Sequence, residues 1–456
     1  MKKIKYFSLV IIVMFSLSIQ AQTKKWTLEE CVKYAIDNNI SIKQVELDTK
    51  TADIDKKAAK GNFLPSLNAN ASHSWNIGLN QDITTGLLRN QTTQFTAAGA
   101  NVGVDIYRGM QNQNTLRRSN LSIVAAKYQL TKMKEDIALN VANAFLQVLF
   151  SKENLKVQQE QKANNEKQLL RSEELVKAGS VPRGDLLDIK ATVAANNQNV
   201  VAAENALLIS KLSLAQLLQL KEFYDFDVTD DTSAKDENKI LSQTPNSIYD
   251  KAKELRTELK LAKTNLEISE KNVAIAKGAF QPTLQGFYNF NSRVSYADVP
   301  LFNDKGQIIG TQSAPSFFNQ FSDNKGQSFG AQLSIPIFNG WSVKNNVERS
   351  KVNLEKSKIA VEQEELTLQR NVYTAFTDAK GGLNAYESAI TAAEAREEAF
   401  KYAKERYAVG MMNSFDFNQS QTLLSNAQSE VLRTKYDYIF KIKILEFYFG
   451  IPIIKN

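Results

Sequence analysis

Two copies of one short phrase, GNFLPSL at 61–67 and GAFQPTL at 278–284, decide how this chain is organised. In each copy, Gly stands two residues before Phe, Pro two residues after Phe, and Leu two residues after Pro. A polar, helix-favouring stretch precedes each copy, and a stretch of alternating apolar and polar residues follows it. Each copy therefore predicts the end of a helix and the start of a strand.

Other matches indicate that the whole chain contains two copies of one unit. Gly109 matches Gly340 and Gly179 matches Gly410, both at a spacing of 231 (340 − 109), whereas the two phrases are 217 apart (278 − 61). One loop insertion of 14 residues (231 − 217) in the second half accounts for the difference. The expected division is a signal peptide at 1–21, a first repeat at 22–220, a linker at 221–247 and a second repeat at 248–456.

The N-terminus has the features of an export signal, with lysines at positions 2, 3 and 5 before a mostly apolar run. That run, about 14 residues long, is too short to span a bilayer comfortably. A retained membrane anchor is the alternative. No later apolar run reaches about 20 residues, so no transmembrane helix is expected. The 56 basic and 49 acidic residues are interspersed, which argues against a nucleic-acid partner.

Four segments alternate between apolar and polar residues, as strands with one apolar face do. They are 67–79, 98–106, 284–296 and 329–337, joined in pairs by expected loops at 80–94 and 297–327. Tilted strands of this length can span a bilayer. The aromatic residues Trp75, Tyr107, Tyr296 and Phe338 lie toward strand ends, as in a membrane girdle. The edge of a soluble sandwich is the alternative.

The remaining chain is predicted to be helical, so the fold is mainly α with a small β part. The expected helices are 26–60, 110–178 and 185–218 in the first repeat, and 245–277, 341–409 and 416–449 in the second. In each repeat the two shorter helices together match the long one, which predicts end-to-end stacking beside it. Their polar faces suit the wall of a water-filled tube. A long coiled coil is the alternative for these segments alone.

The strand number requires oligomerisation if the strands enter a membrane. Four strands cannot close a barrel, which needs about eight. An open sheet would leave unpaired edges in lipid, which the bilayer does not tolerate. The residues alone leave two and three copies open.

With these features the chain resembles the TolC family of outer-membrane efflux proteins. The resemblance rests on the two phrases, the internal duplication, and the segments WTLEECVKYAIDNN (26–39), RSEELVKAGSVPRGDLLDIK (171–190) and YAKERYAVGMMNSFDFNQSQTLL (402–424). It implies a homotrimer in the outer membrane of a Gram-negative bacterium, with a 12-stranded barrel and a periplasmic helical tunnel. Implied partners are outer-membrane lipid, a periplasmic adaptor and an inner-membrane transporter of the RND, ABC or MFS type.

The implied function is a passive exit duct of a tripartite efflux or type I secretion system, for small molecules or polypeptides. A periplasmic coiled-coil scaffold without a pore is the alternative. Alternating strands discriminate between the two, because a scaffold needs no lipid-facing surface.

The resemblance places the turns at Gly179 and Gly410 at the periplasmic tips. In the family, acidic residues just past the second turn ring the narrow entrance. Asp416 matches the first of these positions, but the second is Gln419, which weakens the expected ring. Asp185 and Asp188 hold the equivalent positions of the first repeat. For Asp185 and Asp416, a helix N-cap is the alternative interpretation.

Apolar residues at the tips, Val181 on the first and Met411 and Met412 on the second, are expected to be exposed. The resemblance implies that they dock the adaptor, together with the two turn glycines. Thioethers also suit copper(I), but two adjacent methionines without a third ligand do not predict a metal site. Gly381-Gly382 is expected to interrupt the second long helix, either as a functional bend or as a tolerated kink.

No catalytic, cofactor-binding or metal site is predicted. His73 is the only histidine and lies on the apolar face of a strand, away from any triad-like pattern. The sequence contains no GxxxxGK[ST] phosphate-binding motif, so energy for transport is expected to come from a partner. Cys31, the only cysteine, leaves no internal disulfide and is expected to be packed in the first helix.

Overall fold

The computed structural model describes residues 25–81, 86–221, 226–229 and 240–453. The expected signal peptide and part of the expected linker lie outside the described residues. The chain forms two compact units, which we call the helical unit (Met1–Asp48, Lys127–Leu261, Glu362–Asn456) and the sheet unit (Thr49–Ala126, Ala262–Val361). Each unit takes segments from both halves of the sequence. The two compact units therefore do not coincide with the two predicted repeats.

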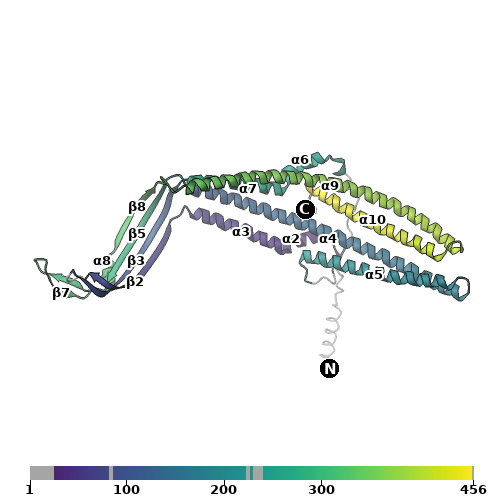
Figure 1. Cartoon of the computed structure of the whole chain (residues 1–456), viewed down its shortest axis with the longest axis horizontal. Helices are drawn as coiled ribbons and strands as arrows, with labels where there is room; N and C mark the ends of the chain where they lie inside the picture. Colours follow the sequence, from purple (N-terminus) through teal and green to yellow (C-terminus); the bar gives the residue numbers. More distant parts are fainter. Residues whose placement is uncertain (1–24, 82–85, 222–225, 230–239, 454–456) are drawn as a thin grey trace, which may run out of the picture. The chain divides into compact units, whose positions relative to one another are not determined.

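The sheet unit contains one antiparallel sheet of four strands, as the sequence predicts (Figure 1). Its strands, in spatial order, are β2 (Ser66–Gln81), β3 (Leu88–Arg108), β5 (Thr283–Ser295) and β8 (Gly326–Ser334). The two halves of the sequence therefore meet where β3 pairs with β5. Strands β2 and β8 are the edges, and each leaves a row of backbone groups unpaired within the single chain.

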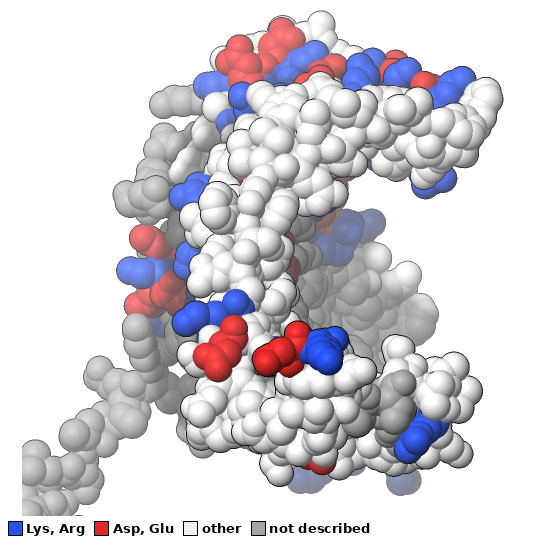
Figure 2. Space-filling model, turned by 90° about the vertical axis from the view of Figure 1, so that its left-hand side faces the viewer, with Lys and Arg blue, Asp and Glu red and all other residues white. Residues whose placement is uncertain are grey.

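The pairing register gathers the apolar positions of all four strands on one side of the sheet. His73 pairs with Thr96, and Thr96 pairs with Val294, so these three side chains share a side. We call this side the outer face; its larger members are Leu67, Trp75, Ile77, Val102, Val104, Tyr288, Phe290, Phe329 and Leu333. The space-filling view in Figure 2 shows wide areas without a charged residue.

Two strand boundaries and one loop differ from the prediction for local reasons. The expected loop at 80–94 is wrong in its extent, because β3 begins at Leu88 and pairs with β2 as far as Gln81. Strand β8 ends at Ser334 rather than 337, since Pro336 has no N–H to donate. The loop at 297–327 has structure of its own: β6 (Val299–Phe302), β7 (Ile308–Gln312) and α8 (Phe317–Asp323).

The long helices confirm the prediction closely. They are α4 (Gln111–Lys177) and α9 (Ser342–Ala408), of 67 residues each, followed by α5 (Arg183–Leu218) and α10 (Ser414–Phe449), of 36 each. Helix α9 continues through Gly381-Gly382, so the two glycines do not end the helix, and a bend there stays a prediction. A Cβ on Gly382 would lie 3.4 Å from Cα of Tyr438, so this glycine allows α9 and α10 to approach closely.

The two shorter predicted helices, 26–60 and 245–277, are each broken in two. The observed helices are α2 (Leu28–Asn38) and α3 (Ile40–Gly61), and α6 (Pro245–Leu255) and α7 (Thr257–Gly278). The break residues, Asn39 and Arg256, have extended backbones with ψ of 129° and 130°. They are 217 residues apart (256 − 39), the same spacing as the two opening phrases, so the break belongs to the repeat.

Each break residue contacts the last turn of the returning helix of its own half. Asn39 Nδ2 donates to Leu217 O in α5 at 3.1 Å. The Arg256 guanidinium lies 3.7 Å from the centre of the Phe447 ring in α10 and donates to Glu135 at 2.8 Å. Burial raises the pKa of Glu135, and the charge of Arg256 opposes that shift. The ends of the short helices therefore meet beside the long ones, as the helix lengths predict.

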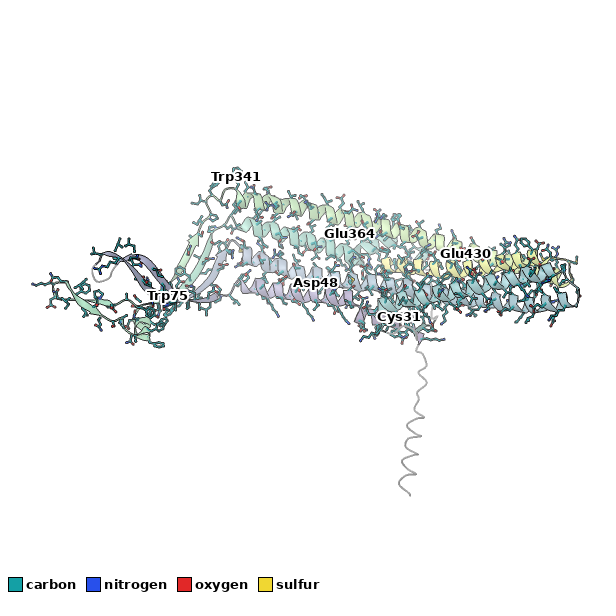
Figure 3. The ribbon with its side chains drawn as sticks, turned by 60° about the horizontal axis from the view of Figure 1, so that its bottom comes forward. Cys31, Asp48, Trp75, Trp341, Glu364 and Glu430 are labelled. Atoms are coloured by element: carbon teal, nitrogen blue, oxygen red, sulfur yellow. The ribbon has the colours of Figure 1, made fainter. Side chains whose placement is uncertain are left out.

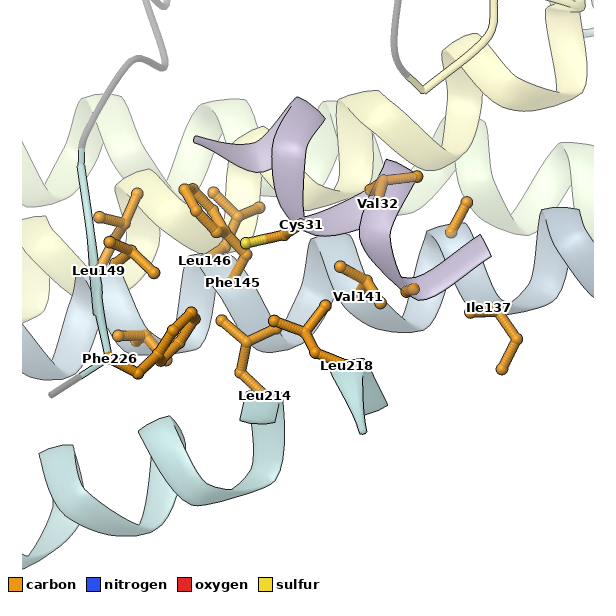
Figure 4. Close-up of a cluster of buried hydrophobic side chains, with 14 of the residues drawn as sticks. Cys31, Val32, Ile137, Val141, Phe145, Leu146, Leu149, Leu214, Leu218 and Phe226 are labelled. Atoms are coloured by element: carbon orange, nitrogen blue, oxygen red, sulfur yellow. The ribbon is translucent and has the colours of Figure 1, made fainter. Parts of the chain in front are cut away.

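The main apolar cluster lies in the helical unit (Figure 4). Val141, Phe145 and Leu149, spaced by four on α4, are buried against Leu214 and Leu218 of α5 and against α2. The spacing by four places these side chains on one face of α4. Phe226 joins the cluster just before β4 (Asp227–Val228), which pairs in parallel with β1 (Lys25–Trp26).

Cys31 of α2 is fully buried in this cluster (Figure 4). Burial, with a smaller contribution from Glu30, raises the pKa of its thiol to about 12. Because the thiolate is the reactive form, this cysteine is an inert packing residue, as predicted.

The expectation that no helix crosses a membrane stays a prediction. By length and composition alone, α5 is apolar enough to cross a bilayer. Packed helices of water-exposed proteins pass the same test. In α5, nine residues between Ile189 and Leu218 are buried.

Candidate functional site at the helical tips

The two helical hairpins, α4–α5 and α9–α10, turn in the same way. At the first tip, Ser180 N donates to Leu175 O at 2.9 Å and Gly179 N donates to Val176 O at 3.0 Å. The second tip repeats both bonds, at 2.8 Å and 3.2 Å, from Met411 and Gly410. This is the Schellman arrangement, which needs a left-handed residue after the helix. Gly179 and Gly410 supply it, with φ of 70° and 75°.

The caps of the returning helices differ from the prediction. Neither Asp185 nor Asp416 is an N-cap, because each lies three residues inside the first turn. The N-cap of α10 is Asn413, whose Oδ1 accepts from Asp416 N at 2.8 Å and whose Nδ2 donates to the Asp416 carboxylate at 2.9 Å. The N-cap position of α5 is Pro182, whose side chain makes no capping hydrogen bond.

The two tips contact each other through polar groups. Ser414 Oγ, which is buried, donates to Asp185 Oδ1 at 3.4 Å. Farther along the same helices, Asn418 Nδ2 donates to Thr192 Oγ1 at 3.4 Å. These two long hydrogen bonds run between α5 and α10, so they join the first hairpin to the second.

An aromatic cluster stabilises the second tip only. The buried Phe417 ring stacks on Tyr407 at 4.6 Å between centres and lies 5.5 Å from Phe400. The repeat spacing of 231 places Leu186, Val176 and Leu169 at the equivalent positions of the first tip. The second tip therefore has stacked rings where the first has aliphatic side chains.

The expected entrance residues differ in how far they are exposed to solvent. Asp416 and Gln419 are exposed on the first turns of α10, and Asp188 is exposed on α5. Asp185 is half-buried by its contact with the second tip. Asp416 points its carboxylate toward Asn413, which restrains the side chain near the turn.

The expected docking residues are only partly exposed. Met411 is 70% exposed and stands out at the second tip. The expectation is wrong for Val181 and Met412, which are half-buried. Gly179 and Gly410 are exposed, and an added Cβ would meet nothing within 4 Å at either.

The expected girdle residues lie at two levels of the sheet, and Figure 3 labels one of them, Trp75. Trp75 pairs with Gln94, whose carbonyl accepts from Tyr296 N at 3.2 Å, so Trp75 and Tyr296 share one level. Tyr107 pairs with Leu284 at the other end, and Phe338 lies four residues past β8. The two levels are 12 residues apart on β5 (296 − 284), or roughly 30 Å of height at a 40° tilt, which matches a hydrocarbon core.

The sequence interpretation missed the residues that shape the tips, namely Asn413, Ser414 and Phe417. Asn413 had a signal, since Asn followed three residues later by an acidic residue is typical of a helix start. Phe417 and Ser414 had none, because their roles depend on which helices face them. Within the described residues, no group of three or more His, Cys, Asp or Glu side chains is arranged to hold a metal ion.

Comparison with known proteins identifies the family. The model of the outer membrane efflux protein family matches residues 32–219 and 248–443. The chain belongs to the outer membrane efflux protein family. Among curated relatives, the outer membrane protein TolC of Vibrio cholerae is 21% identical over 420 residues, covering 91% of this chain and 88% of the relative.

Solved structures agree with this assignment at the level of the fold. The Campylobacter jejuni CmeC outer membrane channel superposes with a TM-score of 0.72 at 18% identity, covering 93% of this chain and 85% of that one. A Pseudomonas aeruginosa membrane protein gives 0.75 at 17% identity, covering 92% and 90%.

This efflux protein is thus an outer-membrane channel whose helical part lies in the periplasm. Its four strands contribute to the 12-stranded barrel of a trimer, which supplies partners for the edges β2 and β8. Efflux channels of this family act with a periplasmic adaptor and an inner-membrane transporter.

Proposed function

We propose that the tips of this efflux protein form a cation-favouring periplasmic entrance. In a trimer, three copies of Asp416 would stand around the end of the duct. Fixed carboxylates in a narrow passage focus the field, attracting cations and repelling anions. The observation that carries the proposal is the bond between Asn413 and Asp416, which holds an exposed carboxylate at the first turn of α10.

The rest of the site supports one ring of carboxylates at the entrance rather than two. Gln419, one turn farther along, carries no charge, so Asp416 supplies the fixed charge on α10 near the tip. Asp188 is also exposed, but on α5, whereas Asp185 is engaged by Ser414.

The test is single-channel conductance of the purified trimer in a planar bilayer. Wild-type openings should be small and cation-selective. Asp416→Ala should lose much of that selectivity and raise the open probability, while Asp188→Ala, the matched exposed acid, should change both less.

Two outcomes would count against the entrance. Cation selectivity that survives in Asp416→Ala would reduce this residue to a partner of the Asn413 cap. Equal effects of both substitutions would point to a diffuse surface charge rather than a ring.

We further propose that the tips dock the adaptor. The residues involved are the exposed Gly179, Gly410 and Met411, together with the half-buried Val181 and Met412. The transporter behind it is of the RND, ABC or MFS type. Because Met411 is exposed without a packing role in the chain, the uncharged substitution Met411→Gln should weaken adaptor binding while leaving conductance unchanged. Unchanged binding of a purified adaptor would remove Met411 from the interface.

A further inference from the structure

The insertion between β5 and β8 contains a feature that the channel function does not explain. Strand β8 begins at Gly326, which pairs with Asn291. Beyond that pair, residues 292–295 of β5 have no strand on the β8 side. The short helix α8 occupies this place and contacts β5.

Side chains of α8 and its C-cap residue replace the missing strand. Ser295 N donates to Gln320 Oε1 at 3.0 Å, and Gln320 Nε2 donates back to Ser295 O at 2.9 Å. Asn324 Nδ2 donates to Arg293 O at 2.7 Å. A glutamine amide thus pairs with the strand as a peptide group would, and it covers an edge that lipid would not tolerate.

The same helix also covers the outer face of β5. Ser292 Oγ donates to Phe321 O at 2.7 Å, and the Phe321 ring lies 6.3 Å from the ring of Phe290. Ser292 and Val294 are buried, although Phe329 on the same face is 84% exposed. Because the outer face carries the apolar side chains, α8 lies on the side of the sheet that meets lipid.

The outward surface of α8 is aromatic. Phe318 is 80% exposed and Phe317 is 39% exposed, and their rings contact each other at 5.4 Å. No charged residue occurs between Lys305 and Asp323. The helix covers β5 next to the level of Tyr296 and Trp75, which we assign to one end of the outer face.

We propose that α8 is an interfacial helix that inserts Phe317 and Phe318 into the outer leaflet of the membrane. Two observations select lipid as the occupant: the aromatic surface continues the lipid-facing side of the sheet, and it stands next to the level of Trp75 and Tyr296. Aromatic side chains are favourable at the boundary between headgroups and acyl chains, which also accommodates the charge of the exposed Asp323 at the end of α8. The helix then anchors the sheet at a place where β8 is too short to do so.

The test measures the depth of a spin label in proteoliposomes of phosphatidylethanolamine and phosphatidylglycerol. Labels are placed by Phe318→Cys, by Phe329→Cys on the outer face, and by Asp304→Cys in the β6–β7 turn. The native Cys31 is buried with a thiol pKa of about 12, so it does not compete for the label. Accessibility to oxygen, which enters lipid, is compared with accessibility to a water-soluble nickel chelate.

The ratio of oxygen to nickel accessibility at position 318 should be several-fold higher than at 304 and lower than at 329. A ratio at 318 equal to that at 304 would place α8 in water and overturn the proposal. Low accessibility to both reagents would also overturn it, because α8 would then pack on a neighbouring protomer. Position 329 reports insertion of the barrel itself, so a failure there is distinguishable from a failure of α8.

A second variant tests whether the hydrogen bonds of Gln320 hold α8 at the membrane. Gln320→Ala should release α8 from Ser295, raise the mobility of a label at 318 several-fold, and lower its oxygen-to-nickel ratio. The label at 329 should be unaffected. An unchanged signal at 318 would show that these hydrogen bonds do not hold the helix at the membrane.

Discussion

The two hairpin tips have the same backbone turn but different means of stabilisation. Both use a glycine with φ near 70° and the same pair of Schellman hydrogen bonds. The second tip adds the Asn413 cap and the stacked rings of Phe417 and Tyr407, whereas the first begins its returning helix at Pro182 without a side-chain cap. The duplication therefore preserved the turn while the side chains around it diverged.

The difference suggests distinct tasks. The second tip carries Asp416 beside a capped turn with stacked rings, which suits the proposed entrance with a fixed charge. The first tip holds its own acid, Asp185, in a contact with Ser414 of the second, which couples the hairpins. Comparing matched substitutions at the two tips tests each part of this contrast.

The largest expected effect is at the aromatic cluster. Phe417→Ala should lower the local stability of the second tip by about 3–5 kcal/mol, because it removes a buried ring and its stacking partners. Leu186→Ala, at the equivalent position of the first tip, should cost roughly 1–2 kcal/mol, since Leu186 is only half-buried. Hydrogen exchange of the amides around each turn measures both. Equal losses would contradict the contrast.

The turn glycines should behave alike. Gly179→Ala and Gly410→Ala should each cost about 1–2 kcal/mol, because an alanine is strained at a positive φ. Neither position has a neighbour within 4 Å of an added Cβ, so backbone strain alone sets the effect. Thermal unfolding and local exchange should agree between the two variants. A clear inequality would mean that the turns differ in ways that their backbone bonds do not reveal.

The N-caps should respond differently. Asn413→Ala should cost about 1 kcal/mol by removing the bond to Asp416 N. It should also loosen the Asp416 carboxylate and reduce cation selectivity in part. Pro182→Ala removes no side-chain hydrogen bond, so its effect should be smaller and confined to the entropy of the unfolded chain. If Pro182→Ala proves as costly as Asn413→Ala, capping does not distinguish the tips.

The smallest expected effect is the link between the hairpins. A double-mutant cycle of Asp185→Ala and Ser414→Ala should give a coupling energy of about 0.5 kcal/mol, as a long hydrogen bond implies. Global thermal unfolding of the two single variants and the double variant provides the values. A coupling energy of zero would leave the hairpins joined only by their apolar contacts and by Asn418.

The sequence by itself determined most features that depend on local repetition. Alternating residues predicted the four strands and their apolar face, and uninterrupted polar stretches predicted α4 and α9 to within about a residue. Glycine spacing predicted both turns, because a left-handed residue is needed where a helix reverses. The family resemblance, carried by these same patterns, indicated the channel.

Only the tertiary structure decided the features that depend on what lies opposite. Asn39 and Arg256 end their helices because a returning helix offers each of them a partner, and no local pattern reveals that. Asp185 contacts Ser414 across 229 residues (414 − 185), and Gln320 pairs with β5 because β8 stops short of it. Local periodicity specifies which elements form, whereas contacts between distant segments specify where elements break and which side chains remain free to act.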